Sequence, residues 1–434
     1  MNLPFAKHTL ANGLDVLLHE DHGCPIVAVN LWYHVGSKNE RPGHTGFAHL
    51  FEHLMFEGSE HHDKGYFRPL HGAGASLNGS TNADRTNYWE VVPANALELA
   101  LWMESDRMGF LLPALTQTKF STQRDVVLNE RRQNYENRPY GLGPMAMLAA
   151  LFPDHPYHWT AIGEEADLQA VELDEVRGFF STYYHPANAS LAIAGDFDST
   201  DALDLVRAYF EELPAGPLVP PVAGAPTALG GEQRIFLEDR VELPRLYVAW
   251  LTPAMFADGD ADLDLAADLL ANGKTSRLYR RLVCDGRIAT DVSAAQNSRE
   301  VGGFVQIAAT ATPGHTLVEL ERAVTDEVSR LAREGPTAAE IDRGRVQAEA
   351  QFMFRLQTVG GFGGKSDQLN AYNTFLGDPD FFSRDLARYD SVTASTLQDA
   401  TRRYLDHGRR VILSIVPRGR PDLAIPDSVI ARVS

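Results

Sequence analysis

A proline-rich stretch near the middle of the chain constrains the fold most strongly. Residues 213–226 contain five prolines and two glycines. Proline fixes its own φ and has no backbone N–H, so neither a continuous helix nor a central strand can pass through this stretch. The chain has 434 residues, which is long enough for at least two domains. We therefore predict domains at residues 1–215 and 232–434, joined by an extended linker at residues 216–231.

The two halves share a weak internal repeat. In each half a helical pattern ends at a tyrosine, and a short apolar strand follows a few residues later. The spacing between Tyr184 and Tyr404 equals the spacing between Leu191 and Val411, which start the two strands. The predicted helix and strand pairs cover residues 171–184 with 190–195, and residues 392–404 with 411–416. This repeat indicates two domains of common ancestry.

The remaining patterns predict an α+β fold class. Alternating or continuous apolar runs predict strands at residues 13–18, 26–33 and 246–251. Helical periodicity predicts helices at residues 47–56, 94–108 and 116–134. Helices and mainly antiparallel strands that alternate unevenly along the chain are typical of the α+β class.

Charge and composition exclude several classes of partner. The chain has 39 Lys+Arg against 58 Asp+Glu, a net charge of −19, which repels nucleic acid. No apolar run is long enough to form a membrane-spanning helix, so we expect no membrane association. The N-terminus lacks a basic region followed by an apolar run, which predicts a cytoplasmic location, or a periplasmic one if a signal peptide was removed. Cys24 and Cys284 are too few for a disulfide framework and lack metal-type spacing.

The segment His49–His53 spells H-x-x-E-H. On a helix, residues four apart project from one face, so both imidazoles can reach one Zn²⁺ while Glu52 stands beside them. The other interpretation is a helix with two surface histidines. The apolar residues around the motif, Leu50 and Phe51 among them, favour a helix packed into a core instead.

The residues around this motif carry a family resemblance. Together with residues 35–40, the segment 46–59 resembles the insulinase/pitrilysin family of zinc metallopeptidases, the inverzincins. In that family a glutamate on another helix is the third zinc ligand. Its distance along the sequence from the second histidine matches Glu130 in this chain. The resemblance implies one Zn²⁺ per chain, bound by His49, His53 and Glu130, with Glu52 as the catalytic base.

The resemblance also implies an architecture. The chain length is similar to the short branch of the family, typified by the subunits of the mitochondrial processing peptidase. In that branch each chain has two homologous α/β-sandwich domains and forms half of a clamshell chamber. The second domain of this chain lacks a zinc motif, so the first should carry the chemistry.

A second family feature is a sheet-edge strand that binds the substrate. The corresponding stretch here is Gly74–Thr81, in which Asn78 and Thr81 match the family pattern and Gly79 replaces the usual alanine. We expect Asn78, Gly79 and Ser80 to contact an extended peptide by strand addition. An ordinary edge strand or loop is the alternative.

One residue near the predicted zinc site differs from the family pattern. The family usually has another glutamate two helical turns before the third ligand, and this chain has Gln123 there. Glutamine keeps the shape and the hydrogen-bonding capacity of glutamate but not its charge. We expect Gln123 to lie close to the metal or the substrate without being a ligand.

The second half departs from the family in a way that predicts a partner. Family members normally carry an Arg and a Tyr there, which stabilise the developing oxyanion. The matching positions are Val283 and Thr290, and Arg287 does not restore the pair because Ala294 follows it at the tyrosine spacing. We therefore expect a heterodimer in which a homologous chain supplies the Arg/Tyr pair.

A glycine-rich segment, Gly360–Ser366, looks like a phosphate-binding loop but fails the pattern, because Val359 stands where the first glycine is required. The helical pattern before it also differs from the strand that such a loop needs. A hinge, a substrate-contact loop or a plain loop are the interpretations left open.

The function that the resemblance implies is a zinc-dependent endopeptidase acting on unfolded or short peptides. A structural or chaperone-like subunit that kept the fold and lost catalysis is the main alternative. An unrelated zinc hydrolase is a third candidate.

Overall fold

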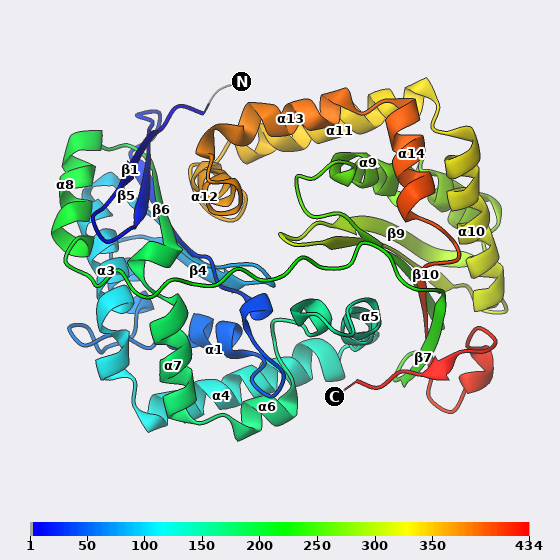
Figure 1. Cartoon of the computed structure of the whole chain (residues 1–434), viewed down its shortest axis with the longest axis horizontal. Coiled ribbons are helices and arrows are strands. Elements are labelled where there is room, and N and C mark those ends of the chain that lie inside the picture. The colour runs from blue at the N-terminus through cyan, green and yellow to red at the C-terminus, as the bar shows by residue number, and fades with distance from the viewer. Residues whose placement is uncertain (1–2, 434) are drawn as a thin grey trace. The chain divides into compact units, whose positions relative to one another are not determined.

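The computed structural model describes residues 3–433 and contains two six-stranded sheets with helices packed against them (Figure 1). This architecture confirms the predicted α+β class with two similar domains. Residues 214–232, within and after the proline-rich stretch, form neither helix nor strand. Within residues 3–433, no helix is both long enough and apolar enough to cross a membrane.

The two sheets share the order of five of their six strands. The first contains, in spatial order, β1 (Ala6–Thr9), β2 (Asp15–Glu20), β6 (Ala189–Gly195), β3 (Ile26–Tyr33), β5 (Thr86–Pro93) and β4 (Ser76–Thr81). The second contains β12 (Val429–Ile430), β7 (Gln233–Asp239), β11 (Val411–Pro417), β8 (Arg245–Thr252), β10 (Gly303–Ala311) and β9 (Ala289–Asn297). In each sheet the third strand is parallel to the second and antiparallel to the fourth. The outer strands differ, because β1 is antiparallel to β2 whereas β12 is parallel to β7. The repeated order of the other five strands agrees with the predicted duplication.

The helices predicted at residues 47–56, 94–108, 116–134, 171–184 and 392–404 are present with shifted ends, and the structure contains further helices that were not predicted. In the first half they are α1 (Phe47–Leu54), α2 (Phe67–Gly72), α3 (Leu97–Ala114), α4 (Gln117–Arg131), α5 (Gly143–Leu151), α6 (Glu165–Ala170), α7 (Leu173–Tyr183) and α8 (Ser199–Phe210). In the second half they are α9 (Asp260–Ala271), α10 (Leu317–Glu334), α11 (Ala338–Arg355), α12 (Lys365–Leu376), α13 (Phe382–Ser391) and α14 (Ala394–Tyr404).

The compact units of the structure differ from the linear halves, because each includes a segment of the other half. The first unit contains residues up to 130, 160–222 and 351–384, and the second contains residues 131–159, 223–350 and 385 onward. Accordingly α12 packs against β3 and β6, whereas α5 packs against β8 and β11. The exchanged segments begin at Arg131 and Gln351, which are equivalent positions of the internal repeat. The domain boundaries predicted at 1–215 and 232–434 stay a prediction.

A buried arginine in α3 balances the charge inside the first unit. Arg107 is 1% exposed and forms an ion pair with Glu104. Its guanidinium carbon lies 4.0 Å and 4.1 Å from the ring centroids of Tyr66 and Tyr88. Burial and the neighbouring Glu104 raise the pKa of Glu90 well above its usual range, which favours the protonated form. The positive charge of Arg107 therefore compensates the negative charge of Glu104, and Glu90 is neutral.

Replacing Arg107 by methionine should destabilise the first unit. The substitution leaves Glu104 buried without a compensating charge, and breaking such a pair costs about 3–5 kcal/mol. Arg207→Met in α8 is the matched control, because Arg207 and Asp204 form an exposed pair, worth about 0–1 kcal/mol. Urea denaturation measures both changes. Equal stability of the two variants would contradict a structural role for the buried pair.

Candidate metal centre

Helix α1 is oriented by its apolar face. Leu50, Phe51 and Leu54 are fully buried, and the ring of Phe51 packs among aromatic rings of α7. Because the core fixes this face, His49 and His53 project together from the neighbouring, partly open side of the helix. Their side chains are 12% and 23% exposed. The predicted helix with both imidazoles on one side is thus what the structure contains.

The N-terminus of α1 is held by a buried carboxylate. Glu40 accepts hydrogen bonds from the backbone N–H groups of Gly46 and Ala48, each 2.9 Å long. A negative charge at this end satisfies amides that lack a partner within the helix and interacts favourably with the helix dipole. Gly46 has a φ of 85°, and a Cβ there would lie 2.9 Å from the carbonyl oxygen of Ile162. Glycine is therefore required where the chain enters the helix.

Glu130, near the end of α4, lies against both histidines. Nε2 of His49 and Nε2 of His53 are 3.7 Å and 3.3 Å from Oε2 of Glu130. One possible ligand atom from each residue lies within 4.8 Å of the others. A tetrahedral zinc ion about 2.0–2.1 Å from each ligand would hold the ligand atoms about 3.4 Å apart. Two imidazoles and a carboxylate at this spacing fit a zinc ion that keeps a fourth position for water.

Burial sets the protonation of the groups around this centre. It lowers the pKa of His49 to about 4, with a smaller contribution from His53, while Glu130 acts in the opposite direction. A neutral imidazole is the form that binds a metal. Burial also raises the pKa of Glu52, and a hydrogen bond with Thr81 partly offsets this shift. A carboxylate whose pKa is raised toward neutrality is better suited to accept a proton from water.

The predicted substrate strand is β4, an outer strand of the first sheet. Asn78, Gly79 and Ser80 all lie in it, and β4 pairs with β5 on its inner side. A Cβ at Gly79 would lie 3.1 Å from Tyr88 and 3.2 Å from Phe56, so the usual alanine would fit only if these rings shifted slightly. The hydrogen bond between Glu52 and Thr81 joins the end of β4 to α1. The structure therefore brings the metal group, the candidate base and the edge strand together.

Gln123 lies on α4, two helical turns before Glu130. Its side-chain amide donates a hydrogen bond to Oε1 of Glu57, just beyond the end of α1. The prediction that Gln123 lies close to the metal or the substrate stays a prediction, since its observed partner is Glu57. A glutamate at position 123 would place two carboxylates against each other. The amide of Gln123, by contrast, can donate a hydrogen bond to the carboxylate of Glu57.

The structure adds two carboxylates that the sequence analysis did not assign, Glu40 and Glu57. Both lie close in sequence to the H-x-x-E-H motif, and their partners are backbone amides of α1 in one case and Gln123 in the other. The sequence could have pointed to them only as charged residues shortly before and after the helix that carries the H-x-x-E-H motif. Their partners depend on tertiary structure.

The positions where the family usually has its Arg/Tyr pair lie in the second unit. Val283 belongs to a π-helical turn, Tyr279–Asp285, and packs against the core of that unit. Thr290 is an exposed residue of β9. Arg287 is exposed and has a φ of 52°. Neither Val283 nor Thr290 offers a guanidinium or a phenol.

Comparison with known proteins matches the two halves of this chain to two domain models of one peptidase family. Residues 15–163 match the family described as "Insulinase (Peptidase family M16)", and residues 170–347 match "Peptidase M16 inactive domain". The chain belongs to the M16, or insulinase, family of zinc metallopeptidases. The resemblance inferred from the sequence is therefore confirmed.

Individual relatives span most of the chain. The zinc protease PqqE of Helicobacter pylori is 29% identical over 355 residues, covering 81% of this chain and 80% of its own. A probable mitochondrial-processing peptidase subunit beta of Arabidopsis thaliana is 24% identical over 416 residues, covering 92% and 75%. A crystal structure of a protease from Helicobacter pylori superposes with a TM-score of 0.89 at 25% identity, covering 96% of this chain and all of the other.

Exchanging the hydrogen-bonding partners at the end of α1 tests the bond between Gln123 and Glu57. Gln123→Glu alone should lower the thermal unfolding temperature, because it sets two carboxylates against each other. Gln123→Glu combined with Glu57→Gln restores a donor facing an acceptor and should recover most of the loss. Calorimetry on the single and double variants measures a coupling energy, expected at about 0.5–3 kcal/mol. Additive effects would show that the two side chains do not interact.

Proposed function

We propose that this chain is a zinc-dependent endopeptidase that cleaves unfolded or short peptides, as the metal-bearing subunit of a two-chain chamber. The observation that carries the proposal is the grouping of His49, His53 and Glu130 within 4.8 Å, with Glu52 on the same helix. Relatives described as zinc proteases support it. We assign one Zn²⁺ to this group.

The side chains of the candidate centre have separate roles in the proposed reaction. His49, His53 and Glu130 would hold a zinc ion, which supplies Lewis-acid activation of the attacking water and of the scissile carbonyl. Glu52 accepts the proton of that water and delivers it to the leaving amine. Its burial removes competing solvent and raises its affinity for the proton.

The outer edge of β4 provides the peptide-binding surface in this proposal. An extended peptide can add to such an edge through main-chain hydrogen bonds, which depend little on side-chain identity. Asn78, Gly79 and Ser80 then contact the substrate. Thr81, at the end of β4, is hydrogen-bonded to Glu52, so the bound peptide passes close to that carboxylate. Peptides that are unfolded or short meet this requirement, because their backbone is free to pair.

The partner is the second part of the proposal. Val283 and Thr290 cannot stabilise an oxyanion as Arg and Tyr do. We infer that a homologous subunit carrying this pair completes the active site. One relative is itself described as a subunit beta. A cytoplasmic location, or a periplasmic one if a signal peptide was removed, stays a prediction.

The substitution Glu52→Gln tests the assigned base. Glutamine preserves size but cannot take a proton, and general acid–base catalysis contributes about 10²–10⁴-fold. The variant should therefore keep one zinc per chain, measured by elemental analysis, and lose cleavage of a mixed peptide library by at least that factor. The variant His53→Ala should lose both the zinc and the cleavage activity. The variant His71→Ala, in α2, should keep both.

Full cleavage by metal-replete Glu52→Gln protein would rule out the assigned base. Equal inactivity of the wild type and the variant, with the partner subunit present, would favour the non-catalytic subunit that the sequence leaves as the main alternative. Chelator-sensitive turnover of small molecules without peptide cleavage would instead indicate the unrelated zinc hydrolase.

Addition of a homologous chain tests the heterodimer. The isolated chain should bind zinc but cleave peptides slowly. A homologue that carries the Arg/Tyr pair should raise kcat by about 10²-fold or more, the scale of restoring an oxyanion donor. A homologue with that pair replaced by Val and Thr is the control. Full activity of the isolated chain would contradict the partner and leave the zinc assignment standing.

A further inference from the structure

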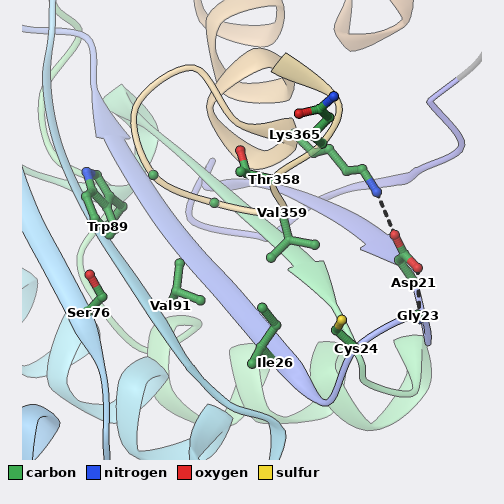
Figure 2. A pocket seen from close by; sticks show the side chains of 13 residues that line it. Asp21, Gly23, Cys24, Ile26, Ser76, Trp89, Val91, Thr358, Val359 and Lys365 are labelled. Carbon is green, nitrogen blue, oxygen red and sulfur yellow. Dashed lines mark hydrogen bonds and ion pairs between the residues drawn. The ribbon is translucent and has the colours of Figure 1, made fainter. Parts of the chain in front are cut away.

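A second feature of the first unit lies on the face of the sheet that α12 covers. A pocket of about 550 Å³ opens between the sheet and the segment 357–361, which precedes α12 (Figure 2). Its walls are mostly apolar and come from β3, β4, β5 and the glycine-rich loop. The residues used below are Cys24, Ile26, Ser76, Trp89, Val91 and Val359.

The glycine-rich loop is fixed closely against the sheet. A Cβ at Gly360 would lie 2.5 Å from Cβ of Ala28, so only glycine allows this approach. The ring of Phe362 meets that of Trp89 edge to face, with centroids 5.5 Å apart. The backbone N–H of Gly363 donates to Asp367 at 2.7 Å. These contacts give the pocket a defined wall and favour a contact loop among the interpretations left open by the sequence.

The chemistry of the pocket selects a neutral, apolar group. Ile26, Trp89, Val91 and Val359 present hydrocarbon or ring surface to it (Figure 2). The ammonium group of Lys365 is paired with Asp21, 2.5 Å away, so this cation is already compensated. Buried apolar surface is worth about 25 cal/mol per Å², which makes a large aliphatic or aromatic side chain the best occupant.

The pocket is continuous with the outer strand β4. In the strand register Ser76 is opposite Val91 and Asn78 is opposite Trp89, and Ser76, Trp89 and Val91 line the pocket. Alternate residues of a strand share one face, so a peptide added along β4 places every second side chain on this same face. Ser76 precedes Thr81 by five residues, which is about 17 Å along a strand.

We propose that this pocket binds an apolar side chain of the substrate, about five residues from the bond nearest to Glu52. The proposal rests on the peptide-binding role of β4 in the proposed function. The substrates would then be extended peptides with a large apolar residue at that distance from the cleaved bond. The edge of β4 alone recognises main-chain groups and does not distinguish side chains.

Alkylation of cysteine provides a test that does not depend on turnover. Cys24 lines the pocket and is exposed, whereas Cys284 is exposed in the second unit. The full-length, zinc-loaded Glu52→Gln protein is treated with iodoacetamide in the presence of polar peptides that carry one Phe at successive positions. Matched peptides carry Asp in its place. Mass spectrometry gives the modification rate of each cysteine.

We expect Phe peptides of the correct register to slow alkylation of Cys24 and not of Cys284. They should act at concentrations about 10-fold or more below those of the Asp peptides, the scale of one large apolar contact. Ser76→Phe, which fills the pocket from β4, should abolish the difference, and Ser76→Ala should keep it. Equal protection by Phe and Asp peptides, or an unchanged preference in Ser76→Phe protein, would overturn the proposal.

Cleavage assays separate this proposal from the proposed function. Phe peptides that protect Cys24 but are never cleaved by the wild-type chain with its partner would contradict the endopeptidase and support the pocket. Cleavage of Phe and Asp peptides with the same kcat/KM at every position would contradict the pocket and support the endopeptidase.

Discussion

The burial of one face of α1 is the constraint on which the candidate centre depends. The helix has eight residues, too few to be stable by itself in water. Its position comes from apolar side chains in the core and from Glu40 at its N-terminus. Because the N-terminus and one face are fixed, the two imidazoles converge on Glu130 from a helix that is already in place. The functional geometry is therefore a consequence of packing on the opposite side of the helix.

The first unit, which contains the candidate centre, also depends on segments from the second half of the chain. The first unit contains the candidate centre, yet α12 and the glycine-rich loop on its sheet come from the second half. Asp367 of α12 accepts hydrogen bonds from Asn30 and from the indole of Trp32, both in β3. These buried polar contacts fix α12 on the sheet more specifically than apolar packing alone. A substitution in the second half can thus alter the surface beside β4.

Local patterns predicted the parts of the fold that depend on local sequence. The strands β3 and β8, the helix α1 and the repeat offset follow from apolar periodicity and spacing, which adjacent residues determine. Glu130 lies on another helix, and only the family resemblance pointed to it. The bond between Gln123 and Glu57 and the exchange of α5 and α12 join residues far apart in the sequence. No periodicity records such contacts, because they depend on how the elements pack after they form.

The combination of an edge strand with one apolar pocket sets the selectivity that such a site can reach. Main-chain pairing along β4 distinguishes extended from folded substrates and is nearly independent of side chains. A single apolar pocket discriminates between side chains by about 10–200-fold. Charge adds little at the pocket, because Lys365 and Asp21 compensate each other. In the proposed function, a site of this construction would therefore select the conformation of its substrate strongly and the substrate's sequence weakly.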